Sequence, residues 1–207
     1  VQSAPQDTVG VHVELLRGLR DEHGGLGPPD TLIPAAGLYG LMPEIDRWVI
    51  RHAFKHLRGA PHIQGQAISQ CAINLSATSI GDTELLEYIN EQFSVSRIDP
   101  ALICFEITET SAITKLTQAQ SLIASLRQIG CRFALDDFGA GMSSFRYLKH
   151  LPVDFLKIDG SLIVSMLEDA ASLAMVEMIN HLAHMMDIQT VAEFAENNAI
   201  IEQLRTI

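Results

Sequence analysis

Polar side chains lie on six short apolar segments of this 207-residue chain, each near the C-terminal end of its segment. They are Glu14, Asn74, Glu106, Asp136 with Asp137, Lys157 and Glu193. A charge buried in a strand costs several kcal/mol unless it is paired or binds a metal. Lys157 alone could be a structural ion-pair partner, but seven such residues on six successive segments favour a functional site.

Residues 132–144, RFALDDFGAGMSS, form the most distinctive of these stretches. A short apolar run ends in Asp136 and Asp137, and Gly139 follows almost at once. Neighbouring side chains on a strand point to opposite faces. Both carboxylates therefore reach one place only if the strand ends there, as Gly139 indicates. An acidic turn after a strand is the alternative interpretation of this stretch taken alone.

The oxygen-rich character of the set indicates its chemistry. Carboxylates and an amide, without cysteine or histidine, select Mg²⁺ or Mn²⁺ over zinc or copper. This many acids gathered at one site suit two metals, which activate a water molecule and neutralise a phosphoryl group. Lys157 would then supply a compact positive charge or hold a water molecule.

Other candidate ligands offer no competing site. His52 with His56 and His181 with His184 lie within predicted helices and lack the carboxylate of an HExxH motif, so we expect surface or packing roles. Residues 139–141 lack the third glycine of a nucleotide-binding fingerprint.

Composition limits the class of protein. The length suits one domain, and the formal net charge of −11 argues against a nucleic-acid polymer as partner, because phosphate backbones require a basic surface. Three cysteines without CxxC spacing predict buried free thiols in a reducing compartment. We find no signal peptide or spanning helix. Because the chain begins at Val1 and stops at Ile207, we expect a piece of a longer protein.

Hydrophobic patterning predicts strands that alternate with helices. The strands are expected at residues 11–16, 71–75, 102–108, 133–135, 155–158 and 188–194. The helices are expected at residues 43–57, 82–93, 116–129, 144–150, 170–186 and 197–204. Residues 1–10 are predicted to be a linker, and residues 17–34 a long loop rich in glycine and proline.

This alternation implies parallel strands joined by helical crossovers, in an α/β fold. Continuous apolar runs suit strands that are covered on both faces. A barrel of the (β/α)₈ kind and an open doubly wound sheet both fit, although six strands are too few for a full barrel. In a barrel, the polar side chains would converge at the C-terminal face, where active sites lie.

Five motifs together resemble the EAL domain family, whose members act as phosphodiesterases or receptors for the bacterial second messenger cyclic di-GMP. The motifs, in family order, are INLS (Ile73–Ser76), FEITET (Phe105–Thr110), LDDFGAGMSS (Leu135–Ser144), LPVDFLKIDGS (Leu151–Ser161) and VAEFAE (Val191–Glu196). The resemblance implies a modified TIM barrel over residues 11–207, with the first and last strands missing from this chain. It also implies hydrolysis of one phosphodiester of cyclic di-GMP to linear pGpG with two Mg²⁺ or Mn²⁺ ions.

The same resemblance assigns roles to individual residues through the matching motifs. The implied metal ligands are Glu14, Asn74, Glu106 and Asp136 for the first ion and Asp137 for the second. Lys157 and Glu193 match the positions that orient and activate the attacking water. Glu109 is similar to the family glutamate that holds the DDFG loop in place, and completes the implied catalytic set. The implied ligand-binding positions are Leu16, Arg17, Asp159 and Phe194.

The segment that names the family leaves two alignments open. Placing Glu14 on the family glutamate needs no gap, but it puts Gly18 at the phosphate-binding arginine and Arg17 on the opposite side of an extended strand. Placing Arg17 on that arginine instead puts Val13 at the metal-binding glutamate and forces an insertion. The first alignment, which we prefer, keeps catalysis and weakens substrate binding by about 1.5–3 kcal/mol. The second predicts an inert domain.

The main expectation is therefore a metal-dependent cyclic di-GMP phosphodiesterase. We expect a cytoplasmic homodimer that is fused to GGDEF and sensory domains. One alternative is a catalytically weak or inactive receptor for cyclic di-GMP, and another is a scaffold that binds neither ligand nor metal. The altered segment around Glu14 and Arg17 is the feature that separates them.

Overall fold

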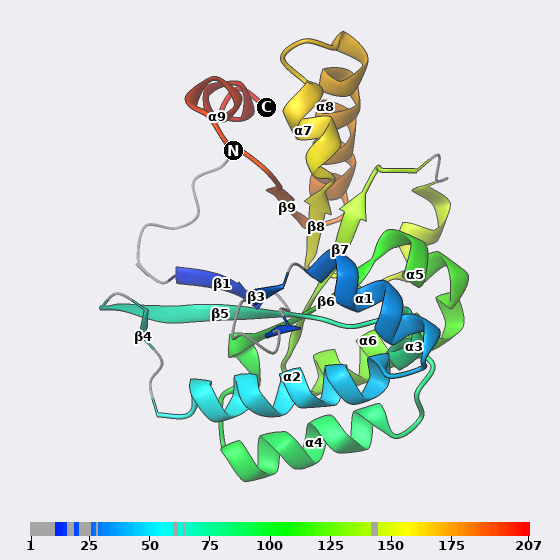
Figure 1. Ribbon diagram of the computed structural model, residues 1–207. Coiled ribbons are helices and arrows are strands. Elements are labelled where there is room, and N and C mark those ends of the chain that lie inside the picture. The colour runs from blue at the N-terminus through cyan, green and yellow to red at the C-terminus, as the bar shows by residue number, and fades with distance from the viewer. Residues whose placement is uncertain are drawn as a thin grey trace.

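The computed structural model describes residues 11–15, 19–20, 26–27, 29–59, 62–63, 65–141 and 145–207. The predicted linker at residues 1–10 and the predicted binding residues Leu16 and Arg17 lie outside these ranges. Within them, parallel strands form a curled half-barrel with helices packed against it (Figure 1).

Six strands pair in parallel in the order β1-β5-β6-β7-β8-β9. Their bounds are Val11–Leu15, Gln66–Asn74, Ile103–Thr108, Arg132–Phe138, Phe155–Ile158 and Gln189–Ala192. Strand β4 (His62–Ile63) pairs antiparallel with β5, and β2 (Leu19–Arg20) pairs antiparallel with β3 (Leu26–Gly27). The predicted α/β fold and its six strands are confirmed.

Helices follow most of the strands, as expected for β/α units. The α-helices are α1 Pro29–Leu38, α2 Met42–Leu57, α3 Ala77–Ile80, α4 Leu85–Ser96, α5 Glu109–Thr114, α6 Leu116–Ile129, α7 Gly160–Ser165, α8 Ala170–Met185 and α9 Asn198–Leu204. Two 3₁₀ helices complete the set, η1 at Pro100–Leu102 and η2 at Phe145–His150. Figure 1 shows α2 and α4 side by side along one side of the sheet, and α7 beside α8 at its other end.

The two faces of the sheet differ in chemistry because side chains alternate along each strand. One face carries fully buried apolar residues that pack against the helices, among them Ile73, Phe105, Phe133, Leu135 and Leu156. The opposite face, here called the inner face, carries mostly small or polar residues together with Phe155; among them are Ala72, Cys104, Glu106, Ala134, Asp136 and Lys157. The core therefore anchors each strand and leaves its inner face free for the polar set.

Three expectations about the elements were wrong in detail. Residues 17–34 are not one loop, because β2 and β3 lie there and α1 begins at Pro29, where the fixed φ of proline suits a first helical turn. Strand β5 begins at Gln66, since pairing with β4 extends it beyond the apolar segment. Strand β9 ends at Ala192, so Glu193 lies just after it.

The cysteines agree with the prediction from their spacing. Cys71, Cys104 and Cys131 are buried and free, and burial raises the pKa of Cys71 to about 11 and that of Cys131 to about 12. None of the helices in the described ranges has both the length and the apolar character needed to cross a bilayer.

Asp154 joins the N-terminal ends of β7 and β8. Its Oδ2 accepts a hydrogen bond from the backbone N–H of Phe133 at 2.8 Å, and its Oδ1 lies 3.1 Å from Nη2 of Arg127. Nη1 of Arg127 donates to the carbonyl of Pro152 at 2.9 Å. This end of the half-barrel is thus tied by side chains, whereas the polar set lies at the other end.

We expect Asp154→Ala to lower the free energy of unfolding by about 1–3 kcal/mol, because the Phe133 N–H then loses its partner. Urea denaturation followed by circular dichroism measures this change. A variant as stable as the unaltered chain would contradict the structural role given to Asp154.

Candidate metal centre and active site

Lys157 lies at the centre of the polar set. Its Nζ is 2.9 Å from Oδ1 of Asp136, 3.0 Å from Oε2 of Glu106, 3.0 Å from Oε1 of Glu193 and 3.3 Å from Oε2 of Glu14. The Lys157 side chain is only 7% exposed. Four carboxylates thus surround one buried ammonium, and negative charge remains in excess.

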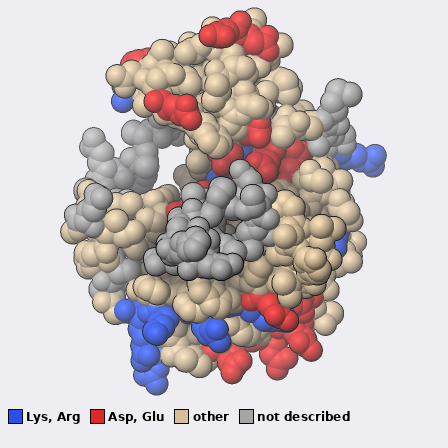
Figure 2. All heavy atoms as spheres, in the orientation of Figure 1, with Lys and Arg blue, Asp and Glu red and all other residues tan. Residues whose placement is uncertain are grey.

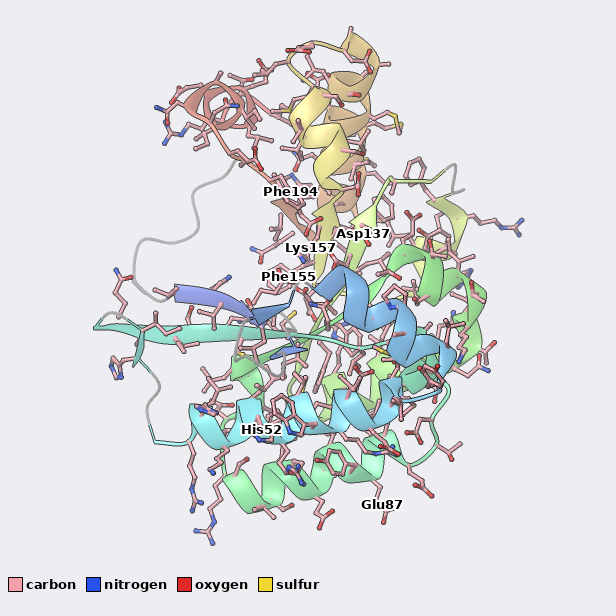
Figure 3. All side chains as sticks on the ribbon, viewed as in Figure 1. His52, Glu87, Asp137, Phe155, Lys157 and Phe194 are labelled. Carbon is pink, nitrogen blue, oxygen red and sulfur yellow. The ribbon has the colours of Figure 1, made fainter. Side chains whose placement is uncertain are left out.

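The strands bring these residues together from distant parts of the chain. Glu14 lies on β1, Asn74 on β5, Glu106 on β6, Asp136 on β7 and Lys157 on β8. Nδ2 of Asn74 donates to Oε1 of Glu14 at 2.9 Å, which adds the amide to the cluster. Figure 2 shows acidic atoms gathered in a hollow in the middle of the molecule, and Figure 3 shows Asp137, Lys157 and Phe194 in that region.

Both aspartates of the DDFG motif reach the site, by a different route from the one expected. Strand β7 does not end at Asp136 but continues to Phe138, with a register irregularity against β8 between Leu135 and Phe138. Asp137 has a φ of 53°, in the left-handed region that aspartate tolerates better than most residues. A bulge within the strand, rather than its end, therefore turns the two neighbouring carboxylates toward one place.

Two groups of carboxylate oxygens lie close enough to hold cations. Glu14, Glu106 and Asp136 offer oxygens within 4.8 Å of one another, and so do Asp136, Asp137 and Glu193. Asp136 belongs to both groups. Its buried Oδ1 forms an ion pair with the Lys157 ammonium at 2.9 Å but accepts no hydrogen bond from any described residue. All of these donors are hard oxygens, so the cluster fits divalent cations such as Mg²⁺ and Mn²⁺.

The protonation of the cluster follows from burial and charge. Burial, opposed by Lys157 and reinforced by Glu14, raises the pKa of Glu106 to about 7. Burial alone would lower the pKa of Lys157, but Glu106 and Asp136 outweigh it and raise the pKa, so the ammonium stays charged. Burial and the charge of Asp136 raise the pKa of Glu193 and of Asp137. The cluster is therefore short of positive charge.

Glu109 lies beside the cluster rather than in it. It is buried at the start of α5, and its Oε2 accepts a hydrogen bond from the backbone N–H of Gly139 at 3.0 Å. The hydroxyl of Tyr147 donates to its Oε1. Gly139 has a φ of 94°, and an added Cβ would lie 2.9 Å from Ile179 and Leu162. Glu109 thus holds the backbone that follows the two aspartates.

The predicted binding residues Asp159 and Phe194 lie at the rim of the site. Asp159 caps α7, since its Oδ1 accepts a hydrogen bond from the backbone N–H of Ser161 at 3.0 Å. Phe194 is 62% exposed with a φ of 52°, and its ring lies against Gly160. A Cβ on Gly160 would be 2.0 Å from Cδ2 of that ring. Only glycine leaves room for the ring there.

The structure thus brings most of the predicted residues together around Lys157. Glu109 lies against the backbone of Gly139, and Asp159 lies at the start of α7. Val13, which the second alignment places at the metal-binding glutamate of the family, packs against the core. Sequence reasoning missed Tyr147 and Gly160. A glycine directly after the helix cap Asp159 was the only signal for Gly160, and Tyr147 had none. The histidine pairs lie elsewhere, with His52 stacked on Trp48 along α2 (Figure 3).

Parallel β/α units with an acidic cluster at the carboxyl ends of their strands define a barrel-type protein with a candidate metal centre. The chain belongs to the EAL domain family, because the sequence profile of that family matches residues 5–207. The resemblance inferred from the motifs is thereby confirmed.

Solved structures of the family share this fold. The EAL domain of FimX from Pseudomonas aeruginosa, bound to c-di-GMP, superposes with a TM-score of 0.84 at 30% identity, covering 93% of this chain and 76% of that one. The PaMucR phosphodiesterase in complex with c-di-GMP gives 0.83 at 29% identity, covering 93% of this chain and 78% of that one. The modified TIM barrel predicted from the motifs is therefore confirmed.

Curated relatives are similar over nearly all of this chain. Cyclic di-GMP phosphodiesterase PdeB of Shewanella oneidensis is 42% identical over 196 residues, which are 94% of this chain and 22% of PdeB. Cyclic di-GMP phosphodiesterase PdeF of Escherichia coli is 34% identical over 197 residues, 95% of this chain and 26% of PdeF. The chain thus spans about a quarter of the length of these relatives.

Removing the positive charge of Lys157 should lower the stability of the domain, because the carboxylates around it then lack a counter-charge. We expect Lys157→Met to lower the free energy of unfolding in EDTA by about 3–5 kcal/mol, because it leaves buried carboxylates uncompensated. Excess Mg²⁺ or Mn²⁺ should restore part of this loss. Urea denaturation with EDTA and with each cation measures both effects. Lys149→Met, at an exposed position, is the matched control, and equal losses in the two variants would refute the interpretation.

Proposed function

We propose that this chain hydrolyses one phosphodiester of cyclic di-GMP to linear pGpG with two Mg²⁺ or Mn²⁺ ions. The observation that carries the proposal is the pair of carboxylate groups that share Asp136 beside a buried ammonium. Similarity to cyclic di-GMP phosphodiesterases over more than nine tenths of this chain supports the choice of substrate.

In this proposal, Glu14, Asn74, Glu106 and Asp136 hold the first ion, and Asp137 the second. Glu193 lies in the same oxygen group as Asp137, which suits a further contact to the second ion or to its water. When bound, the two ions neutralise the phosphoryl charge and lower the pKa of a water molecule.

The proposed role of Lys157 is to donate hydrogen bonds and not to accept a proton, because its raised pKa keeps Nζ charged near neutral pH. It fixes the carboxylates of Glu106 and Glu193 and can orient a water molecule beside them. Glu193 is the proposed proton acceptor, because burial and the charge of Asp136 raise its pKa, whereas Lys157 stays protonated. Glu109 is proposed as a positioning residue, because it holds Gly139 behind Asp137.

The contacts of Glu14 support the alignment that needs no gap. Glu14 meets Lys157 and Asn74, whereas Val13 packs against the core. Under this alignment Gly18 occupies the position of the phosphate-binding arginine, which is the observation that favours a second candidate function. A chain that binds cyclic di-GMP and cuts it weakly or not at all would act as a receptor.

The setting of the domain is also proposed. We place residues 11–207 as an EAL-type domain of a longer signalling protein with GGDEF and sensory domains, in agreement with its small share of PdeB and PdeF. A homodimer is the expected assembly. The three buried free thiols suit the cytoplasm, where thiols stay reduced.

Incubation with cyclic di-GMP and Mg²⁺ or Mn²⁺, resolved by anion-exchange chromatography, tests the reaction. We expect pGpG to form, EDTA to stop it, and Glu14→Ala to lower the rate at least about 10²-fold, equivalent to about 2.7 kcal/mol of lost transition-state stabilisation. Glu87→Ala, on the exposed side of α4 far from the site (Figure 3), should leave the rate unchanged.

Each outcome selects one function. Uncut cyclic di-GMP that co-elutes with the protein would refute hydrolysis and support the receptor. A nucleotide that is neither cut nor bound would refute both and leave the scaffold.

The contact between Gly160 and Phe194 predicts a separate effect on substrate binding. Gly160→Ala should push the ring from its position and remove a surface for stacking a base, which is worth about 1–3 kcal/mol or about 5–150-fold in KM. Steady-state kinetics measures the change, and Mn²⁺ affinity should stay constant. Gly37→Ala is the control, because nothing lies within 4 Å of its added Cβ. An unchanged KM in Gly160→Ala would exclude Phe194 from binding.

A further inference from the structure

Asp46 is a fully buried acid outside the metal centre. It lies on α2 with a relative exposure of 0%, although α2 forms part of the outer helical layer. Burying a carboxylate is costly unless strong hydrogen bonds compensate for the lost water. The contacts of Asp46 therefore indicate what the carboxylate does.

One oxygen of Asp46 binds the turn that follows β5. Oδ2 accepts a hydrogen bond from the backbone N–H of Ser76 at 2.8 Å and another from the hydroxyl of Ser79 at 2.6 Å. Ser76 in turn caps the short helix α3, since its Oγ accepts from the backbone N–H of Ser79 at 3.3 Å. In Figure 1, α3 lies close to one end of α2, in agreement with these bonds.

This turn begins two residues after Asn74, the amide of the metal centre. Between them, the backbone N–H of Leu75 donates to the carbonyl of Glu106 at 2.8 Å. The backbone just after Asn74 is thus held by β6 on one side and by Asp46 on the other. Asn74 itself donates to Glu14 at 2.9 Å, so its position also affects a second proposed ligand.

We propose that Asp46 is a positioning residue of the metal centre, which acts through Ser76 to fix the end of β5 and so the amide of Asn74. The inference rests on the proposed function, because it assumes that Asn74 contacts a cation. Charge-assisted bonds to a backbone N–H are short and directional, which suits this task. Loss of such outer support commonly costs 10–100-fold in metal affinity.

Asp46→Ala tests the inference. We expect its apparent Kd for Mn²⁺ to rise about 10-fold or more, measured by isothermal titration calorimetry with MnCl₂ well below the melting temperature. Asp154→Ala is the matched control, since it also removes a carboxylate from a backbone N–H, but at the N-terminal ends of the strands. Both variants should be less stable, and only Asp46→Ala should bind Mn²⁺ more weakly.

A double-mutant cycle with Asn74→Ala shows whether the effect passes through Asn74. If it does, adding Asp46→Ala to Asn74→Ala should weaken Mn²⁺ binding no further than Asn74→Ala alone. Fully additive losses would overturn the proposed route. If Asp46→Ala does not fold, Ser79→Ala removes the 2.6 Å bond to Asp46 and the 3.1 Å bond to the Ser76 hydroxyl. It keeps the bond from the Ser76 N–H to Asp46 and should give a smaller rise in Kd.

The outcomes separate this inference from the proposed function. Unaltered Mn²⁺ affinity in Asp46→Ala, with normal binding by the unaltered chain, would refute the positioning role alone. Failure of the unaltered chain to bind Mn²⁺ would refute the metal centre and this inference together. Mn²⁺ binding without hydrolysis would leave the positioning role intact and refute only the enzymatic proposal.

Discussion

The ion pairs of the buried Lys157 ammonium are the interactions on which the site depends. Four carboxylates lie within 3.3 Å of Nζ, and the positive charge of Lys157 could not remain buried without these carboxylates. The reverse is also true, because the carboxylates would repel one another without the ammonium. Its single charge cannot balance four, however, so the cluster remains suited to further cations. Structural pairing and the proposed cation binding thus use the same oxygens.

The backbone at this end of the half-barrel is arranged to aim side chains, at some cost in strain. Asp137 and Phe194 both have a φ near 50°, which costs non-glycine residues about 1–2 kcal/mol each. Such residues persist only where the surroundings hold them in place. Here Glu109 holds the backbone after Asp137, and Gly160 leaves room for the ring of Phe194. Arg97 and Asp187, which precede β6 and β9 at the opposite end, have similar φ values of 56° and 58°, so positive φ is not confined to the site.

The sequence was most informative where one physical rule acted alone. Apolar runs that ended in acids located the strands and five of the residues that meet at the site, because carboxyl ends of parallel strands share one edge. The bulge at Asp137 could not be foreseen, since it depends on pairing with β8 rather than on local pattern. The role of Asp46 was equally hidden. Asp46 lies within the helix predicted at residues 43–57, and its burial follows from the packing of α2 against the turn at Ser76, which the local sequence does not show.

These features explain why stability and cation binding should be linked in this fold. An acidic cluster that is short of positive charge opposes folding, whereas the proposed cation, when bound, would stabilise the domain by an amount that grows with its concentration, about 2.7 kcal/mol at 100 times Kd. Neutralising one acid would relieve repulsion but remove a ligand. The large apolar face of the sheet tolerates this imbalance, because the core that anchors each strand lies on the opposite side from the charges. The fold can therefore keep a charged, strained edge without losing the strands that form it.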